Sequence, residues 1–398
     1  MPVVGHDPVT VPGTPAGCLS SGLSDGSKCG FCGITLKEQE ILPRLGHSYT
    51  YTDMGDSHKG TCIRCNKEVT AAHSYTDGSC ICGATESTDP ILDSSILINH
   101  TLNLASDISI NFAVRTELLA GYSDHRLVCE IPVYEGNTQV GTRSLTIEPV
   151  LQGYFYYYTL DGLTAVNIGD QVTATLYMTK DGKTYCSNAD RYSVATYAYS
   201  QIAKTSDPAL KALCADLLRY GSMAQIFKSY RTDSLCDSAM TQEQKAYLTD
   251  LGTVTFGNTA MEAPDMNAPA ITWVGKALDL NSKVTLRFVC NTASYLGDPT
   301  DLTLEVRYTD YAGVEQRKVL RDPVPYGSAG YYSFSFDGLL AAELRTVLCV
   351  TVYDGETPLS NSYLYSADTY GNGKTGTLLD LCKALFAYSD SAKAYFVG

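Results

Sequence analysis

Alternating apolar and polar positions predict a β-strand near residue 108. Ile108, Ile110 and Phe112 alternate with Ser109 and Asn111, which is the pattern of a strand buried on one face. Similar runs, separated by Gly, Asp and Asn turn signals, predict two further sets of strands. These runs lie at 127–134, 140–147, 154–160 and 171–178, and again at 302–308, 316–320, 331–336 and 347–353.

Apolar residues with helical spacing follow each set of strands. They predict helices over 192–203 and 208–230 after the first set and over 378–396 after the second. Ser206-Asp207-Pro208 is a helix start, because a capping side chain stands before a proline of the first turn. We therefore expect an α+β fold in which each half is an antiparallel β-sandwich, or small barrel, with a C-terminal helical pair.

The two halves also share short landmarks in the same order. The run 102–112 matches 278–288 at an offset of 176 (278 − 102). The dipeptide 187–188 matches 360–361 at 173 (360 − 187), and Leu213-Cys214 matches Leu381-Cys382 at 168 (381 − 213). Landmarks that recur in order with small deletions predict two homologous copies of one fold.

These patterns divide the chain into successive parts. We expect an N-terminal arm over 1–15, a Cys/His region over 16–84, the first copy over 91–230, a linker with a short helix over 231–264 and the second copy over 265–398. The short helix begins at the capping box Thr241-Gln-Glu-Gln244. A link over 85–90 joins the Cys/His region to the first copy.

The Cys/His region carries the strongest chemical signal of the chain. Half of the fourteen cysteines fall between Cys18 and Cys82, with three histidines among them. Two thiols separated by two residues can hold one metal ion from a tight turn. The region contains few large aliphatic residues, so burial alone cannot order it. We therefore expect structural zinc, and the candidate ligands are Cys18, Cys29, Cys32, His47, His58, Cys62, Cys65, His73, Cys80 and Cys82.

The spacing leaves the grouping of these ligands open. One site can be built from Cys18, Cys29, Cys32 and His47, and a second from His58, Cys62, Cys65 and His73. Cys80 and Cys82 either complete a site with Cys62 and Cys65, which releases the histidines, or pair with another module. Disulfides are the alternative to zinc. A catalytic zinc is not expected, because each CxxC has four candidate ligands and needs no open position.

Two stretches of this region resemble a known kind of repeat. The stretch from Cys18 to His47, with Cys29-Gly-Phe-Cys32-Gly33 and Leu45-Gly-His47, resembles a zinc-ribbon-like repeat of large secreted proteins of Gram-positive gut bacteria. The stretch from His73 to Gly83 resembles its companion motif, although one residue, not two, separates Cys80 from Cys82. The paired C-terminal modules are also similar to modules of such proteins. The resemblance implies export and a spacer or surface-display role, and it implies no activity.

Charge and hydropathy narrow the choice of partner and location. The net charge of −14 is spread along the chain and repels phosphate, so we expect no nucleic-acid partner. No apolar run of about 18 residues predicts a membrane span. The first residues show no signal peptide, so the protein is either cytoplasmic or a fragment or processed form of an exported protein. Composition, with 29 tyrosines and only 29 lysines and arginines, favours an extracellular or cell-surface location. The seven later cysteines are scattered singly, as expected of buried free thiols.

Catalytic signatures are missing from the rest of the chain. It shows no G-x-S-x-G, no HExxH, no phosphate loop and no G-x-G-x-x-G between a strand and a helix. His125 is expected in an exposed loop. We therefore expect a non-catalytic modular protein for adhesion or ligand display, with a protein or glycan as its unidentified partner. The alternatives are a glycan-binding module that uses exposed tyrosines such as those at 154–158, and a hydrolase of unrecognised type.

Overall fold

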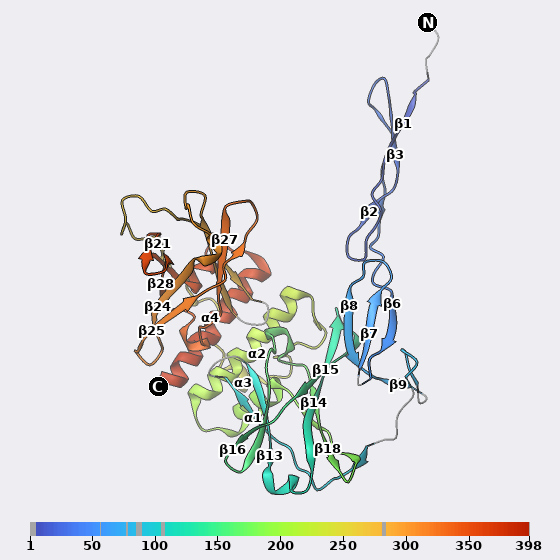
Figure 1. Cartoon of the computed structure of the whole chain (residues 1–398), viewed down its shortest axis with the longest axis vertical. Coiled ribbons are helices and arrows are strands. Elements are labelled where there is room, and N and C mark those ends of the chain that lie inside the picture. Colours follow the sequence, from blue (N-terminus) through green and yellow to red (C-terminus); the bar gives the residue numbers. More distant parts are fainter. Residues whose placement is uncertain are drawn as a thin grey trace. The chain divides into compact units, whose positions relative to one another are not determined.

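A computed structural model describes most of the chain as a β-rich protein with four α-helices among the described residues. The described residues are 5–55, 57–76, 79–84, 90–104, 108–280 and 284–397. Residues 1–89 form most of one compact unit, and residues 90–398 form most of a second. Figure 1 shows the first unit in blue and the second in green to red. The expected link at 85–90 lies outside the described residues except for Pro90, as do residues 105–107 and 281–283 of the repeat landmarks.

The N-terminal unit consists of short antiparallel strands. One sheet has the order β1-β3-β4 and another β6-β7-β8, and β2 pairs with β5 and β9 with β10. The bounds are β1 (Pro8–Val11), β2 (Gly22–Leu23), β3 (Gly26–Cys29), β4 (Thr35–Lys37), β5 (Ile41–Leu42), β6 (Tyr49–Asp53), β7 (Ser57–Cys62), β8 (Glu68–Ala72), β9 (Tyr75–Thr76) and β10 (Ser79–Cys80). Residues 8–11 of the expected arm are therefore part of a sheet, because β1 pairs with β3.

Cysteines take the place of a hydrophobic core in this unit. The buried hydrophobic residues among its described residues are Cys18, Cys29, Cys62 and Cys80. Larger apolar side chains such as Phe31 are exposed. A unit of this kind cannot gain its stability from burial of apolar surface alone.

The first part of the C-terminal unit has two sheets. They have the orders β12-β13-β17-β16 and β11-β19-β18-β14-β15, and β20 also pairs with β18. The bounds are β11 (Ile91–Leu92), β12 (Asn99–Asn103), β13 (Ser109–Arg115), β14 (Ser123–Glu135), β15 (Thr138–Ile147), β16 (Val150–Gln152), β17 (Phe155–Leu160), β18 (Val172–Lys180), β19 (Lys183–Cys186) and β20 (Asp190–Tyr192). The pairings are antiparallel except that of β11 with β19 among the described residues.

The second part also has two sheets, of which the four-stranded one has the same strand order as in the first part and the other differs at its first pairing. Its sheets have the orders β22-β23-β27-β26 and β21-β30-β28-β24-β25, and β29 also pairs with β28. The bounds are β21 (Ala260–Glu262), β22 (Thr272–Asp279), β23 (Thr285–Asn291), β24 (Thr303–Thr309), β25 (Glu315–Leu320), β26 (Val324–Pro325), β27 (Tyr331–Phe336), β28 (Val347–Asp354), β29 (Thr357–Pro358) and β30 (Tyr363–Ser366). The registers correspond too: Phe112 pairs with Tyr158, and Phe288 pairs with Phe334, each 176 residues later (288 − 112 and 334 − 158).

Helices follow each set of strands, but their number differs. The bounds are α1 (Val194–Lys204), α2 (Pro208–Lys228), α3 (Gln242–Lys245) and α4 (Gly376–Val397). The expected helical pair of the second copy is wrong, because a 3₁₀ turn (Ala367–Gly371) precedes α4 where α1 precedes α2. Residues 367–375 between β30 and α4 form this turn and a loop instead of a second helix, and Gly373 and Gly376 have positive φ there.

The caps of α1 and α2 explain where these helices begin. The Ser193 hydroxyl accepts a hydrogen bond from the backbone N–H of Thr196 at the start of α1. The Asp207 carboxylate accepts from the N–H groups of Ala209 and Leu210 at the start of α2. Each cap satisfies a backbone donor that has no partner within its helix.

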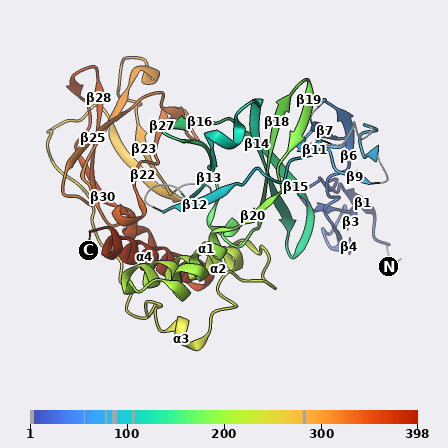
Figure 2. The ribbon, with the colours of Figure 1, turned by 90° about the horizontal axis from the view of Figure 1, so that it is seen from below.

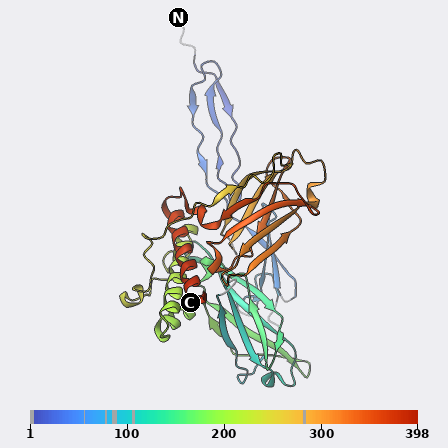
Figure 3. The same ribbon diagram turned by 90° about the vertical axis from the view of Figure 1, so that its left-hand side faces the viewer.

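Helices α2 and α4 lie side by side, as Figures 2 and 3 show. The rings of Tyr220 and Tyr388 stack across them, with centroids 5.9 Å apart and planes inclined by 8°. The Ser391 hydroxyl of α4 donates to the buried Asp216 of α2 at 2.7 Å. The two parts of the C-terminal unit therefore share one helical layer.

The segment expected to be a linker packs onto this layer. Cys236, Met240 and Val254 are buried. The backbone N–H of Cys236 donates to the Gln225 side chain of α2 at 2.9 Å. Much of 231–264 is therefore part of the folded unit.

The scattered cysteines on the long helices are buried. Cys214 and Cys382 are fully buried on α2 and α4. Burial raises the pKa of the Cys214 thiol to about 12 and that of Cys382 to about 11. Neither thiol is in the reactive thiolate form at neutral pH. None of the described helices is long and apolar enough to cross a membrane.

Candidate metal centres

Thiols and imidazoles of the N-terminal unit gather into three clusters. In each cluster the candidate ligand atoms all lie within 4.8 Å of one another. We call them the N-terminal cluster (His6, Cys29, Cys32), the middle cluster (Cys18, His47, Cys62, Cys65) and the last cluster (His58, His73, Cys80, Cys82). Such groups are compatible with a bound metal ion.

Similar turns present the paired cysteines of the three clusters, and the turn of the last cluster is one residue shorter. Cys29 ends β3 and Cys62 ends β7, and in each case the second cysteine lies in the turn to the next strand. A residue of positive φ closes each turn: Gly33 after Cys32, Asn66 after Cys65 and Gly83 after Cys82. Because glycine and asparagine tolerate this conformation best, the sequence favours these turns locally.

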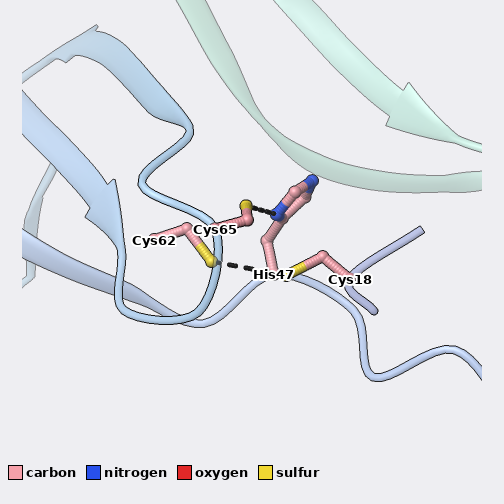
Figure 4. A group of neighbouring side chains, drawn as sticks. All are labelled: Cys18, His47, Cys62 and Cys65. Carbon is pink, nitrogen blue, oxygen red and sulfur yellow. Dashed lines mark hydrogen bonds between the residues drawn. The ribbon is translucent and has the colours of Figure 1, made fainter. Parts of the chain in front are cut away.

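The middle cluster brings together side chains from distant parts of the unit (Figure 4). Cys18 precedes β2, His47 precedes β6, and the paired cysteines come from the end of β7. Backbone hydrogen bonds hold the segments, since Gly46 N–H donates to Cys18 C=O at 3.0 Å. The Cys18 and Cys62 sulfurs lie 3.7 Å apart, and the Cys65 sulfur lies 3.3 Å from His47 Nδ1.

These distances fit ligands around one tetrahedral ion. With Zn–S near 2.3 Å and Zn–N near 2.0 Å, two sulfur ligands stand about 3.8 Å apart and a sulfur and a nitrogen about 3.5 Å apart, so the observed 3.7 Å and 3.3 Å differ from these values by about 0.2 Å or less. A disulfide would bring two sulfurs to about 2.05 Å, far closer than Cys18 and Cys62. All fourteen cysteines are free in the structure. The donor atoms therefore surround a point where a cation fits.

The last cluster adds an outer hydrogen bond that suits a metal ligand. The Cys80 sulfur lies 3.2 Å from His58 Nδ1, and the Cys82 sulfur lies 3.3 Å from His73 Nδ1. The other ring nitrogen of His73 lies 3.1 Å from the Gly55 carbonyl and 3.2 Å from the Asp53 carboxylate. Histidines that bind metals commonly donate their second N–H to such oxygens, which fixes the ring and its tautomer.

The electrostatics of the middle cluster are also compatible with a bound cation. Burial raises the pKa of Cys62, but N–H groups of Arg64 and Ser48 and the His47 ring outweigh this and lower it to about 5. Burial and hydrogen bonds to Cys65 and Cys62 raise the pKa of Cys18 to about 11. The Cys62 thiolate therefore forms readily, whereas the neighbouring Cys18 stays protonated because it is buried and a second negative charge would be repelled. A dication would remove that repulsion and let several thiols ionise together.

In the last cluster, burial raises the pKa of Cys80, but the Cys82 backbone N–H and the His73 ring lower it to about 6. In the N-terminal cluster, the Cys32 backbone N–H and the His6 ring lower the pKa of Cys29 to about 6. In every cluster the pKa of one cysteine thus lies below that of a free thiol, which favours the thiolate form that binds a metal.

The grouping of the ligands differs from the sites that the spacing suggested. Cys18 and His47 join Cys62 and Cys65, and not Cys29 and Cys32. His58 and Cys62 lie on the same face of β7 but four residues apart, which is about 13 Å along a strand, so they cannot share one ion. Cys80 and Cys82 join histidines instead of the CxxC at Cys62.

His6 is a donor that the sequence analysis missed. It lies in the stretch expected to be an arm, and its Nδ1 is 3.6 Å from the Cys32 sulfur. A signal was available, because a histidine also precedes the paired cysteines of both other clusters.

Outside these clusters, two histidines make specific contacts. His100 Nδ1 lies 2.7 Å from the Asp190 carboxylate. In the second part of the C-terminal unit, Lys276 and Tyr363 stand at the strand positions that correspond to His100 and Asp190. His125 is half-buried on β14, with Nδ1 2.8 Å from the Tyr158 hydroxyl, so the expected exposed loop is wrong. Neither contact brings a serine or cysteine nucleophile to the histidine among the described residues.

A glycine-rich run also corrects the sequence analysis. Gly371-Asn-Gly-Lys-Thr-Gly376 has the G-x-G-x-x-G pattern and stands between β30 and α4. The dinucleotide-binding form of this motif lies in a βαβ unit of parallel strands. Here β30 pairs antiparallel with β28 and a 3₁₀ turn intervenes, so the context of that motif is missing.

Comparison with models of known protein families and with curated proteins finds no match to this chain.

Proposed function

We propose that this chain is a non-catalytic, modular extracellular or cell-surface protein. Its N-terminal unit is a zinc-stabilised spacer, and its C-terminal unit consists of two homologous modules, each a β-sandwich with helices, that serve adhesion or ligand display. The observation that carries the proposal is the N-terminal unit itself. Its buried hydrophobic residues, among those described, are cysteines, and each belongs to a cluster of thiols and imidazoles.

Zinc is the metal that these donors favour. Three sulfurs with one imidazole nitrogen, and two sulfurs with two, are typical of structural zinc sites. Both sets have four protein donors, so neither leaves a position for a substrate. The metal's role in these two sites is therefore to hold strands together.

The homology of the two modules is supported by strand order and register. The four-stranded sheets have corresponding orders, and the buried pairs Phe112–Tyr158 and Phe288–Phe334 keep one offset. Two modules on a shared helical layer would present their surfaces in a fixed arrangement, which suits display of a ligand-binding face.

Location is tested on the cells that produce the protein. An antibody against the C-terminal unit should label intact cells or detect the protein in the culture medium. Mild protease treatment of intact cells should remove the cell-bound signal. Detection of the whole pool inside the cells, protected from protease until lysis, would contradict the proposal.

A glycan is the second candidate ligand, favoured by one exposed ring. Tyr154 is 84% exposed beside a hollow that Arg115, Thr116, Glu117 and Phe155 also line. A sugar can stack on such a ring while its hydroxyls bond to the charged groups. The corresponding position of the second module, 176 residues later, is Gly330, so this platform belongs to the first module alone.

Replacing Tyr154 by alanine should then weaken retention on a glycan array. Loss of one stacked ring costs about 1 kcal/mol, roughly a fivefold rise in Kd. Tyr326→Ala, which removes an exposed tyrosine of the second module, is the matched control and should leave binding unchanged. Equal binding of wild type and Tyr154→Ala to every retained glycan would exclude this platform.

A further inference from the structure

The two four-donor clusters share a rule for the origin of their ligands. Each combines a histidine with the next pair of cysteines along the chain, and adds one donor that precedes that histidine. In the middle cluster the added donor is Cys18, and in the last cluster it is His58. Cys18 stands between His6 and Cys29, and His58 stands between His47 and Cys62. Each added donor is thus carried by the segment that builds the preceding cluster.

The N-terminal cluster also combines a histidine with the next pair of cysteines, but it lacks the added donor. His6 precedes the paired cysteines Cys29 and Cys32, as His47 and His73 precede theirs. Among the described residues, no fourth histidine, cysteine, aspartate or glutamate lies close to all three donors. Three protein donors leave one position of a tetrahedral ion open.

The turn around Gly30 places His6 beside the cysteines. Gly30 N–H donates to the Asp7 carbonyl at 2.8 Å, and β1 pairs with β3 from Pro8 to Val11. A Cβ on Gly30 would stand 2.9 Å from the Val9 side chain, so any larger residue at this position would force that side chain to shift. The pairing of β1 with β3 therefore holds the chain next to His6 beside the two cysteines.

We propose that His6, Cys29 and Cys32 hold a third zinc ion whose fourth ligand is a histidine or cysteine side chain of another polypeptide segment. The proposal rests on the structural zinc proposed above. The incoming side chain would complete the N-terminal cluster as its fourth donor, as Cys18 completes the middle cluster. His6 and Cys32 are exposed, so a donor from outside can reach the ion.

The nearest competitor for this position is a carboxylate of the chain itself. The Asp7 carboxylate oxygen lies 3.2 Å from the place of a Cβ on Gly30, next to the turn. It is not within ligand distance of all three donors, whereas the donors of the closed clusters are. The donor added to each closed cluster is a thiolate (Cys18) or an imidazole (His58), and not a carboxylate.

Cobalt(II) provides the test, because its visible absorption in a tetrahedral thiolate site depends on its ligands. The full chain is titrated with cobalt(II) and then with free imidazole, which stands in for the incoming side chain. We expect three ions per chain, one for each cluster, and a change in the bands of one ion on addition of imidazole. His6→Ala should lower the count from three to two and abolish the response, while the control His100→Ala keeps both.

The other outcomes distinguish a failure of the third metal site from a failure of the structural zinc proposed for the two four-donor clusters. Two ions in the wild type would overturn the third site and leave the structural zinc intact. Three ions without a response to imidazole, with bands altered by Asp7→Asn, would also overturn it, because the carboxylate would then be the fourth ligand. Binding of no cobalt at all would overturn both proposals together.

Sedimentation of the zinc-loaded chain identifies the source of the donor. A dimer that His6→Ala abolishes would place the donor on a second copy of this chain. A monomer that retains the imidazole response would exclude a second copy of this chain as the source of the donor. Both results support an open fourth position.

Discussion

Replacing Cys62 by serine should remove one zinc ion from each chain and unfold much of the N-terminal unit. Cys62 is fully buried and supplies one of three sulfurs of the middle cluster. Structural zinc in small modules contributes on the order of 10 kcal/mol to folding, more than the total stability of such a unit. The unit has no hydrophobic core to compensate among its described residues. Residues 90–398 should stay folded, because they have their own extensive core.

The loss is measured by elemental analysis and by limited proteolysis of the full chain. Cleavage should become rapid within 5–84 and stay slow in the helices α2 and α4. Cys349→Ser is the matched control, since Cys349 is half-buried on β28 and belongs to no cluster among the described residues. Equal zinc content and equal protease resistance in Cys62→Ser and wild type would contradict the account.

Asp216→Ala should cause the largest loss of stability in the C-terminal unit, about 3–5 kcal/mol. The Asp216 carboxylate is fully buried in the helical layer. It accepts hydrogen bonds from the Thr249 backbone and hydroxyl, from Ser391 and from Arg219. Alanine would leave these donors, including one nitrogen of the largely buried Arg219 guanidinium, without this acceptor.

Urea denaturation followed by circular dichroism and by the fluorescence of the single tryptophan, Trp273, checks this prediction. Asp216→Asn, which keeps the shape and part of the hydrogen bonding, should lose less. Asp380→Ala removes an exposed aspartate of α4 and should change the midpoint little. A midpoint for Asp216→Ala equal to that of Asp380→Ala would show that the buried carboxylate does not hold the helices together.

The sequence is most informative where one physical requirement determines the pattern. Alternation of apolar residues places β27 at Tyr331–Phe336 with the predicted bounds, because its inward side chains must all be apolar. The cap at Asp207 and the proline after it locate the start of α2. The cysteine pairs mark the turns of the candidate metal centres, because two thiols separated by two residues can hold one metal ion from a tight turn.

The sequence does not show which of the predicted ligands lie in the same cluster, and the reason is physical. Strand β7 carries His58 into one cluster and Cys62 into another, and only its extended geometry separates them. His6 was missed because it stands 23 residues (29 − 6) from its nearest cysteine partner in the chain. The absence of a second long helix before α4 depends on the backbone conformation there, which is visible only in the folded chain.

The central claim is that zinc, bound by thiols and imidazoles, replaces the core of the N-terminal unit. The most direct test is the metal content of the full chain, purified without chelator, with X-ray absorption at the zinc edge. The account predicts at least two zinc ions per chain, surrounded by sulfur and nitrogen in a mean ratio of five to three for the two closed clusters (3 + 2 sulfurs to 1 + 2 nitrogens). A metal-free chain with an ordered N-terminal unit, or zinc surrounded mainly by oxygen, would contradict it.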